Sequence, residues 1–320
     1  MMKPLQRGAA LLAAMITVTV VATLATASLW QQWRSVEVEQ ADRTRIQSSW
    51  ILTGALDWAR LILREDFTGE HADYLSEPWS VPLKEARLST FLAADQGTGM
   101  DAGSDADQVF LSGEITDLQA RLNLACLVQA GSVHPTWLET FQRLFEVLGL
   151  PQAQLTRLAE NLRFASDISV DNKNAARAPL APQRLEQLAW LGMSPDIVAA
   201  LEPYVTILPT TSSKVNINTA PAEVIFAVGR ELSLADAKRL VAERERQPFK
   251  FLDDSRKVLA KATFDGSSAA VETQYFEVRG RLRMADVVIE ERSMVNRVGR
   301  TVRTVQRERG TFQGVVPATR

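Results

Sequence analysis

The stretch RGAALLAAMITVTVVATLATASLWQQW, residues 7–33, decides how the rest of this chain is organised. Lys3 and Arg7 precede its apolar part, and the next charged residue is Arg34. About 25 uncharged residues form a helix of roughly 37 Å, which is long enough to span a bilayer. Because the basic residues lie before this run, we expect the short N-terminus to stay in the cytoplasm and the chain after Arg34 to lie across the membrane.

The junction at Gly8 adds a processing signal. A basic leader, a glycine directly before the apolar run and small residues directly after it resemble the leader of type IV prepilins. The resemblance implies cleavage by a prepilin peptidase after Gly8 and a mature chain that begins at Ala9, is N-methylated and keeps its apolar helix. The alternative is an ordinary secretory signal, because residues 25–27 form a small-x-small cleavage site. The leader alone leaves both interpretations open.

The fifth mature position distinguishes this chain from most pilins. It holds Ala13, whereas most pilins carry a glutamate, whose charge is thought to be offset by the N-terminal ammonium of a neighbouring subunit. A subunit without this carboxylate cannot make that pairing with a subunit ahead of it. In this respect the chain resembles the protein K family, the largest minor pseudopilins of type II secretion, which are thought to lie at the fibre tip.

Composition sets broad limits on the function. The chain has 320 residues, 46% of them hydrophobic, so we expect a substantial core and about two domains. A formal net charge of -2 gives no electrostatic reason for a nucleic acid or an anionic surface to be the main partner. The single Cys126 cannot form an internal disulfide, and thiol catalysis would need His71 or His134 as its base. We therefore expect no enzyme.

Helical spacing continues beyond the apolar run. Apolar residues recur at three- and four-residue intervals and predict an amphipathic helix that ends near Asp66. These positions are Ile51, Ala55, Trp58 and Ile62. One helix over residues 9–64 would be roughly 84 Å long, which resembles the long first helix of pilins. Two helices with a break near Arg34 are the alternative.

Residues 77–112 have the chemistry of turns and loops, including DQGTGMDAGSD at 95–105. The acidic spacing of this loop does not match an EF-hand, so a solvated loop between two strands is the preferred interpretation. A strand is predicted at residues 109–115 and a polar motif follows it. Strands in the protein K family lead into an Asp, Gln, Gly, Arg, Phe, Asn, Leu, Asn pattern. The matching residues here are Asp117, Gln119, Arg121 and Asn123, whereas Ala120 replaces Gly and Ala125 replaces the last Asn.

Residues 136–201 show a helical pattern with two apolar stripes, one from Trp137 to Leu148 and one from Leu155 to Leu162. Between the helices, residues 167–178 occupy the place where the protein K family often has an acidic segment able to hold calcium. The ligands that this resemblance implies are Asp167, Asp171, Asn172 and Asn174. Calcium would be an optional ligand, since the interpretation requires no cofactor.

Residues 214–221, KVNINTAP, form the most specific stretch after the leader and resemble the helical domain of protein K. We expect Asn216 and Asn218 to bond local backbone, and Thr219 or Asn218 to cap a helix that has Pro221 early in its first turn. The same stretch resembles the helix-hairpin-helix modules that competence DNA receptors combine with a membrane anchor. This is the alternative function.

Two features of the hairpin argue against DNA as its ligand. A phosphate-binding hairpin normally needs two glycines around one apolar residue, whereas residues 228–233, VGRELS, have one glycine and a carboxylate. Residues 214–257 contain nine basic and seven acidic side chains, a surplus of only two. We therefore expect no nucleic-acid partner.

The C-terminal part returns to strands. Residues 276–284 alternate between apolar and charged side chains, and residues 287–291 and 301–305 predict two more strands around a turn near Gly299. The fold class is therefore α+β: a pilin-like long N-terminal helix packed on a small antiparallel sheet, with a large all-α domain of the SAM-like or helix-hairpin-helix-like type inserted between strands. The predicted parts are a leader at 1–8, a transmembrane helix at 9–33, a pilin-like domain at 34–118 and 271–320, and the inserted domain at 119–270.

The resemblance covers the whole chain and implies a minor pseudopilin of the type II secretion system, without enzymatic activity. Such a protein would be a single-pass protein of the inner membrane with most of its chain in the periplasm. It would start and cap the pseudopilus together with the minor pseudopilins I and J. The prepilin peptidase would be a processing partner, and the exported substrate or the outer-membrane secretin would be further contacts.

Overall fold

The structure is a computed structural model that describes residues 7–67, 72–90, 109–167, 177–284 and 287–310. The chain divides into two compact units, residues 1–54 and residues 55–320. The first helix, α1 (Arg7–Asp66), contains residues of both units. The predicted helix end near Asp66 is confirmed, and the structure assigns no break at Arg34.

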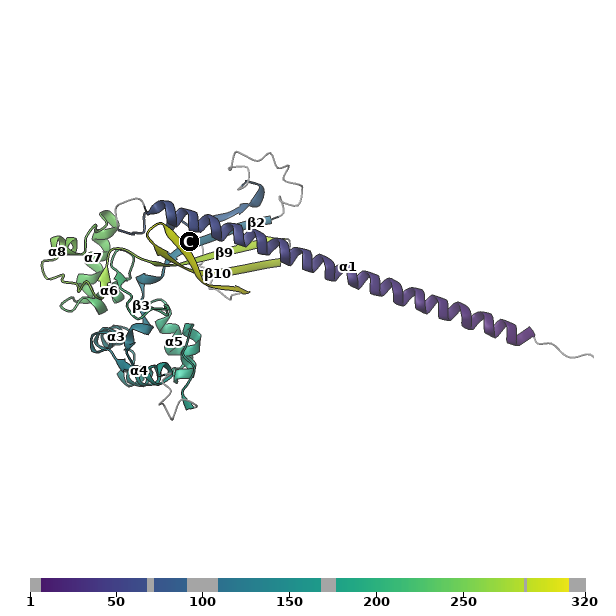
Figure 1. Cartoon of the computed structure of the whole chain (residues 1–320), viewed down its shortest axis with the longest axis horizontal. Coiled ribbons are helices and arrows are strands. Elements are labelled where there is room, and N and C mark those ends of the chain that lie inside the picture. Colours follow the sequence, from purple (N-terminus) through teal and green to yellow (C-terminus); the bar gives the residue numbers. More distant parts are fainter. Residues whose placement is uncertain (1–6, 68–71, 91–108, 168–176, 285–286, 311–320) are drawn as a thin grey trace, which may run out of the picture. The chain divides into compact units, whose positions relative to one another are not determined.

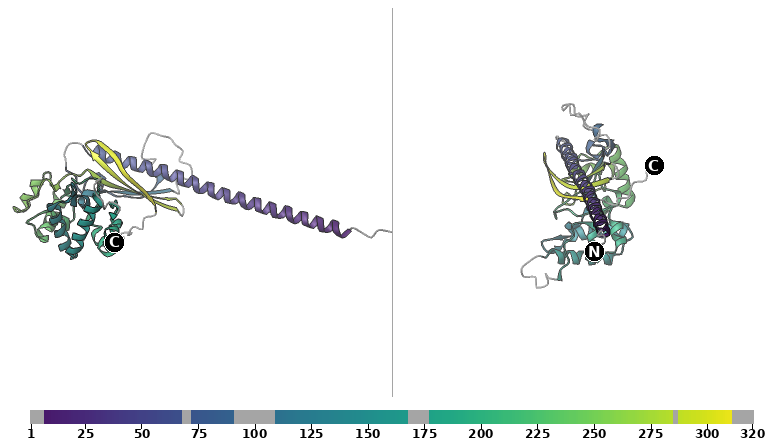
Figure 2. Two further views of the ribbon diagram at one scale, coloured as in Figure 1. Left: turned by 60° about the horizontal axis from the view of Figure 1, so that its bottom comes forward. Right: turned by 90° about the vertical axis from the view of Figure 1, so that its right-hand side faces the viewer.

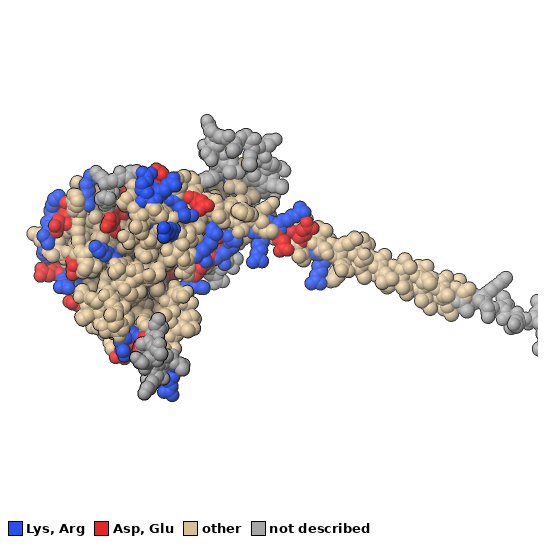
Figure 3. Space-filling model, in the orientation of Figure 1, with Lys and Arg blue, Asp and Glu red and all other residues tan. Residues whose placement is uncertain are grey.

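The first unit is the N-terminal part of α1. Its apolar side chains are exposed, among them Leu11, Val18 and Leu24, which are each more than 60% exposed. The uncharged surface of this segment is visible in Figure 3, where charged residues first appear farther along the helix. Within the described residues, α1 is the one helix that is long and apolar enough to cross a membrane.

The second unit contains a five-stranded antiparallel sheet in the order β1-β2-β9-β10-β11. The strands are β1 (Leu83–Arg87), β2 (Val109–Asp117), β9 (Tyr275–Met284), β10 (Val287–Val298) and β11 (Thr301–Gly310). The predicted strands at 109–115, 276–284, 287–291 and 301–305 are all present, and the last two are longer than predicted. Gly299, with a φ of 56°, forms the predicted turn between β10 and β11.

The last turns of α1 lie across one face of this sheet (Figures 1 and 2). Leu56, Ala59 and Leu63 of α1 pack with Phe276 and Val278 of β9. The predicted buried face of α1 was wrong by one position, since Trp58 remains 42% exposed. The helix carries a second apolar set at the same spacing, and this leucine-containing set contacts the sheet. The Trp79 ring, 5.2 Å from that of Phe276 and edge-on to it, closes the core.

Neighbouring strands β2 and β9 are joined by 157 intervening residues, 118–274, which form the inserted helical part. The fold class predicted from the sequence is thus confirmed. The main helices of this part are α3 (Pro135–Val147), α4 (Gln152–Ser166), α5 (Pro195–Leu201), α6 (Ala222–Val228), α7 (Leu234–Arg246) and α8 (Ser255–Val258). Short 3-10 helices lie at Pro78–Ser80, Leu118–Ala120, Leu124–Leu127, Leu185–Leu191 and Leu252–Asp254.

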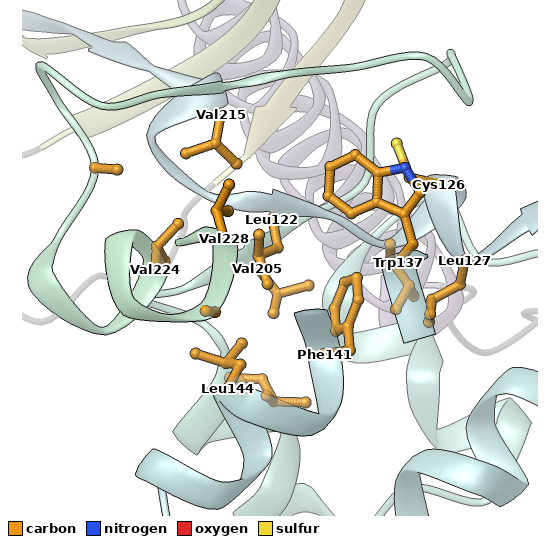
Figure 4. Packing of buried hydrophobic residues seen from close by; sticks show 14 of the residues in the cluster. Leu122, Cys126, Leu127, Trp137, Phe141, Leu144, Val205, Val215, Val224 and Val228 are labelled. Carbon is orange, nitrogen blue, oxygen red and sulfur yellow. The ribbon is translucent and has the colours of Figure 1, made fainter. Parts of the chain in front are cut away.

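Short strand pairs connect the segments of this inserted part. In the two parallel pairs, β3 (Leu122–Asn123) lies beside β6 (Val205–Thr206), and β7 (Val215–Asn216) lies beside β8 (Ala269–Ala270). The strands β4 (Val128–Gln129) and β5 (Ser132–Val133) form an antiparallel hairpin. Both predicted apolar stripes are buried, with Phe141 and Leu144 of α3 beside Leu122 and Val205 in the core (Figure 4).

Candidate functional site: a buried polar junction

The polar motif after β2 lies where the chain leaves the sheet and enters the inserted part. Asp117 ends β2, and its Oδ1 accepts a hydrogen bond of 2.6 Å from the backbone N–H of Gln119. This bond starts the 3-10 turn Leu118–Ala120, where an aspartate N-cap satisfies a backbone donor that has no partner within the turn. Ala120, where the family pattern has Gly, belongs to this turn without a positive φ.

Asp117 also binds two later segments of the chain. Its Oδ2 accepts hydrogen bonds from the Thr219 hydroxyl (2.6 Å) and the Asn216 amide (3.0 Å). Its Oδ1 accepts a bond of 2.7 Å from the hydroxyl of Thr273, which lies just before β9. One carboxylate therefore connects the end of β2, the loop before α6 and the chain that returns to the sheet.

Burial in this junction makes ionisation of Asp117 costly. Loss of hydration raises the pKa of its carboxyl to about 6, while the hydroxyls of Thr219 and Thr273 oppose the rise. Among the described residues, the four hydrogen bonds to the carboxylate come from neutral donors and none comes from a guanidinium. The site thus holds a carboxyl group that takes up a proton in the mildly acidic range.

Two further motif residues have similar connecting roles. The side-chain oxygen of Gln119 accepts a bond of 2.6 Å from the N–H of Gln274, and its amide donates to the carbonyl of Lys214 at 2.7 Å. The Asn123 oxygen accepts from the N–H of Leu208 at 2.9 Å, and its amide donates to a carbonyl at 2.6 Å. Asp117, Gln119 and Asn123 are all buried. Asp117 and Gln119 therefore hold the inserted part to the sheet, whereas Asn123 connects two segments within the inserted part.

A buried ion-pair cluster lies beside the junction. Arg297 of β10 pairs with Asp73 and, at 3.1 Å, with Asp66 at the end of α1. The second oxygen of Asp73 accepts a bond of 2.7 Å from the N–H of Thr273. Burial raises the pKa values of both aspartates and the Arg297 charge opposes the rise. Burial also raises the pKa of nearby Glu77 to about 7.

The carboxylates of Asp66, Asp73 and Glu77 lie within 4.8 Å of one another, which is a spacing that a cation could bridge. Arg297 already supplies a positive charge to two of them. Glu77 accepts bonds from the Trp79 indole at 2.7 Å and the Tyr74 N–H at 2.9 Å. The donors present therefore explain this cluster as part of the protein's own packing.

The loop before α6 makes a local hydrogen bond as predicted, but its helix cap differs from the prediction. The Asn216 oxygen accepts from the N–H of Asn218 at 3.0 Å, so the local bond is confirmed. The capping prediction was wrong, because Pro221 holds the N-cap position of α6 without a side-chain cap. The Asn218 side chain instead bonds the backbone of Phe249, and Thr219 bonds Asp117. Because the loop is buried, these short polar side chains form hydrogen bonds with distant segments of the chain and not with the start of α6.

The hairpin between α6 and α7 is occupied by a side chain of the protein itself. The Arg143 guanidinium of α3 donates to the carbonyls of Phe226 (2.7 Å), Gly229 (2.8 Å) and Leu232 (3.1 Å). It also lies over the Phe226 ring, with 4.5 Å between the guanidinium carbon and the ring centroid. The hairpin thus presents carbonyls to an internal cation, and Leu232 is buried in the core.

The processing and metal predictions keep their status as predictions. Gly8, Ala9 and Ala13 lie in α1, and Ala13 is exposed. Of the four implied calcium ligands, Asp167 lies just after α4, whereas Asp171, Asn172 and Asn174 fall outside the described residues. Cys126 is buried, with the pKa of its thiol raised to about 11 by burial, which is unfavourable for thiolate chemistry.

The sequence did not identify Asp73, Arg143 or Arg297 as important. No sequence pattern marks Arg143 or Arg297, because Arg143 shares its helix face with Glu139 and Thr140, and Arg297 shares its strand face with polar residues such as Ser293. Asp73 lies in a segment without a regular pattern, and its partner Arg297 is 224 residues away. Nothing local could have linked these two residues.

Comparisons with known proteins agree with this architecture. Two family models, both described as type II secretion system (T2SS) protein K, match residues 120–210 and 215–279. Type II secretion system protein K of Pectobacterium carotovorum subsp. carotovorum is 24% identical, with 99% of this chain and 100% of that protein covered. The protein of the same name from Klebsiella pneumoniae is 25% identical, with 96% and 97% covered.

A solved structure gives the corresponding match in three dimensions. It is a chain of the GspK-GspI-GspJ complex of the type 2 secretion system from enterotoxigenic Escherichia coli. The TM-score is 0.65 at 20% sequence identity, and the match covers 85% of this chain and 99% of that chain. At this identity the match establishes a shared fold.

Proposed function

Because this chain belongs to the protein K family of the type II secretion system, we propose that it is the minor pseudopilin that starts and caps the pseudopilus. In this proposal it binds the minor pseudopilins I and J, has no enzymatic activity and is anchored in the inner membrane by α1. The observation that carries the proposal is the insertion of a helical part between the neighbouring strands β2 and β9, held there by the Asp117 junction. Such a part at one end of a pilin-like sheet would leave no room for a subunit beyond it.

Three further points support this proposal. The related solved structure comes from a complex of K with I and J, which is the assembly proposed for this chain. The residue at position 13 is Ala, which offers no carboxylate to a subunit ahead. The uncharged stretch of α1 provides a membrane anchor that a prepilin peptidase would leave in place.

The competence-type DNA receptor is the weaker alternative. Its hairpin would need free backbone N–H groups for a phosphate. In this chain the N–H of Gly229 bonds Ile225 at 2.9 Å and the N–H of Leu232 bonds Gly229 at 3.2 Å. Arg143 meanwhile holds the hairpin carbonyls.

A pair of leader variants tests the proposal in secreting cells that lack the native copy. We expect Gly8→Leu to block processing and secretion, because the peptidase reads the glycine before the apolar helix. The matched control Ala27→Leu should be processed normally and restore secretion, although it would block a conventional signal peptidase. Mass spectrometry of the membrane-extracted protein should find Ala9 as the first residue. A mature chain that begins at Ser28 would disprove the pseudopilin assignment.

A further inference from the structure

A groove of about 640 Å³ lies between the sheet and the inserted part. One wall comes from the sheet face opposite α1, because Glu277 and Arg279 alternate with the core residues Phe276 and Val278. The other wall comes from the turn after β2, from residues 183–186 and from the segment around β6. Contacts made through α1 would leave this groove open.

The groove combines an apolar floor with charged walls. The floor residues that offer surface to a ligand are Ile207 and Met294, which are half-buried, whereas Leu118 and Val205 are only 5% and 0% exposed. Four arginines and four glutamates line the walls, so the groove has no net charge from these groups. A strongly acidic or strongly basic ligand therefore gains no general attraction here.

The arginines of the groove differ in their partners. Arg279 pairs with Glu114 at 2.9 Å and with Glu277 at 3.2 Å, and Arg184 pairs with Glu308 at 2.9 Å. Arg292 lies 3.4 Å from Glu290. Each of these three cations is thus already used within the fold.

Arg121 is the exception among these four arginines. It is half-buried, and within the described part of the chain its side chain makes no hydrogen bond, ion pair or ring contact. It is also the one residue of the Asp117, Gln119, Arg121, Asn123 motif that the junction does not use. A half-buried guanidinium presents a fork of N–H donors that matches a carboxylate bidentately.

We propose that this groove binds an extended segment of a neighbouring minor pseudopilin, with one carboxylate of that segment on Arg121 and apolar side chains on the floor. The segment carries a single acidic residue among apolar ones, because the exposed Glu186 and Glu202 on the rim repel a polyanion. The proposal rests on the proposed assembly with the minor pseudopilins I and J. It adds the surface through which one of them docks and the residue that recognises it.

The test measures binding of the full-length protein in detergent to its cognate I and J proteins. Arg121→Glu should weaken the complex at least tenfold, because it places a carboxylate against the carboxylate of the partner. Arg121→Gln should weaken it less, since it removes only the attraction. The matched control Arg163→Glu changes the net charge equally on an exposed part of α4 away from the groove and should leave affinity within twofold. Acid-to-arginine variants across I and J should include one that restores binding to Arg121→Glu.

The outcomes separate the two proposals. If the unmodified protein binds I and J, but Arg121→Glu and Arg121→Gln bind equally well, the groove proposal is wrong and the assembly stands. If the unmodified protein binds neither I nor J, both proposals fail. If Arg121→Gln and Arg163→Glu have equal melting temperatures, a loss of binding reflects the groove. If the melting temperature is lowered only in the Arg121 variants, Arg121 stabilises the fold and the proposal is overturned.

Discussion

Replacement of Asp117 by Asn tests the buried junction most directly. The amide has nearly the same shape as the carboxyl, but it turns one of two acceptor oxygens into a donor. The Asp117 oxygens face the Gln119 N–H, the Asn216 amide and the hydroxyls of Thr219 and Thr273. Whichever way the amide lies, at least one buried donor meets another donor, which costs about 1–3 kcal/mol.

The pH dependence of this cost carries the sharper prediction. Burial raises the Asp117 pKa from 3.8 to about 6, so the folded state binds this proton more tightly than the unfolded state. Stability from this group therefore increases as the pH falls through about 6 and is complete below the unfolded pKa. With these two values the wild-type protein gains about 1.4 kcal/mol between pH 8 and pH 5, a gain that the Asn variant lacks.

Opposing effects at pH 8 nearly cancel. At pH 8 the ionised carboxylate destabilises the folded state by about 3 kcal/mol. The Asn variant avoids this cost, but it loses hydrogen bonds of similar free energy. The variant should thus be close to wild type at pH 8 and, in a chain of 320 residues, melt about 2 °C lower relative to wild type at pH 5. Thermal unfolding of the full chain in detergent, followed by circular dichroism, measures this difference. The exposed Asp196→Asn is the control. A gap between variant and wild type that is equal at the two pH values would refute the reasoning.

Two further predictions concern the hairpin and the N-terminus. Arg143→Ala removes the hydrogen bonds to the carbonyls of the hairpin and should lower the free energy of unfolding in denaturant by about 2–3 kcal/mol. The control Arg163→Ala, on the exposed face of α4, should change it by less than about 0.5 kcal/mol. Ala13→Glu places a carboxylate in the apolar helix without a partner ahead of it and should bring no gain in pseudopilus assembly, scored by the amount of this protein found in sheared fibres. Enrichment of this variant along the fibre body would show that the protein is not confined to the tip.

Patterned segments were predicted well from the sequence. The period-two alternation before Met284 gave strand β9 and its buried face, because each strand has one apolar side against α1. The stripes of α3 and α4 gave the core of the inserted part for the same reason. In α1 two apolar sets compete at equal spacing, so periodicity located the helix but chose the wrong face.

The site was predicted only in part. Asp117, Gln119 and Asn123 were noticed as a motif, but their partners lie about 85 to 156 residues away along the chain. Short polar side chains carry strong local preferences, and the sequence therefore suggested caps and turns for Asn218 and Thr219. Burial favours the distant partners instead, because each polar group of a buried loop must form a hydrogen bond with a neighbouring group in the fold.

The hairpin shows how a binding module can be kept for packing alone. A phosphate-binding hairpin exposes successive N–H groups at the start of a helix, where the helix dipole assists an anion. Here the N–H groups of Gly229 and Leu232 bond carbonyls within the hairpin, and a Cβ on Gly229 would lie 2.5 Å from the Leu232 side chain. The glycine is therefore needed for close packing of Leu232, which is buried in the core. Arg143 donates hydrogen bonds to the carbonyls of the hairpin. A turn in which two N–H groups and the glycine serve the core retains its shape without any anion, and this accounts for a hairpin in a chain whose other features indicate a pseudopilin.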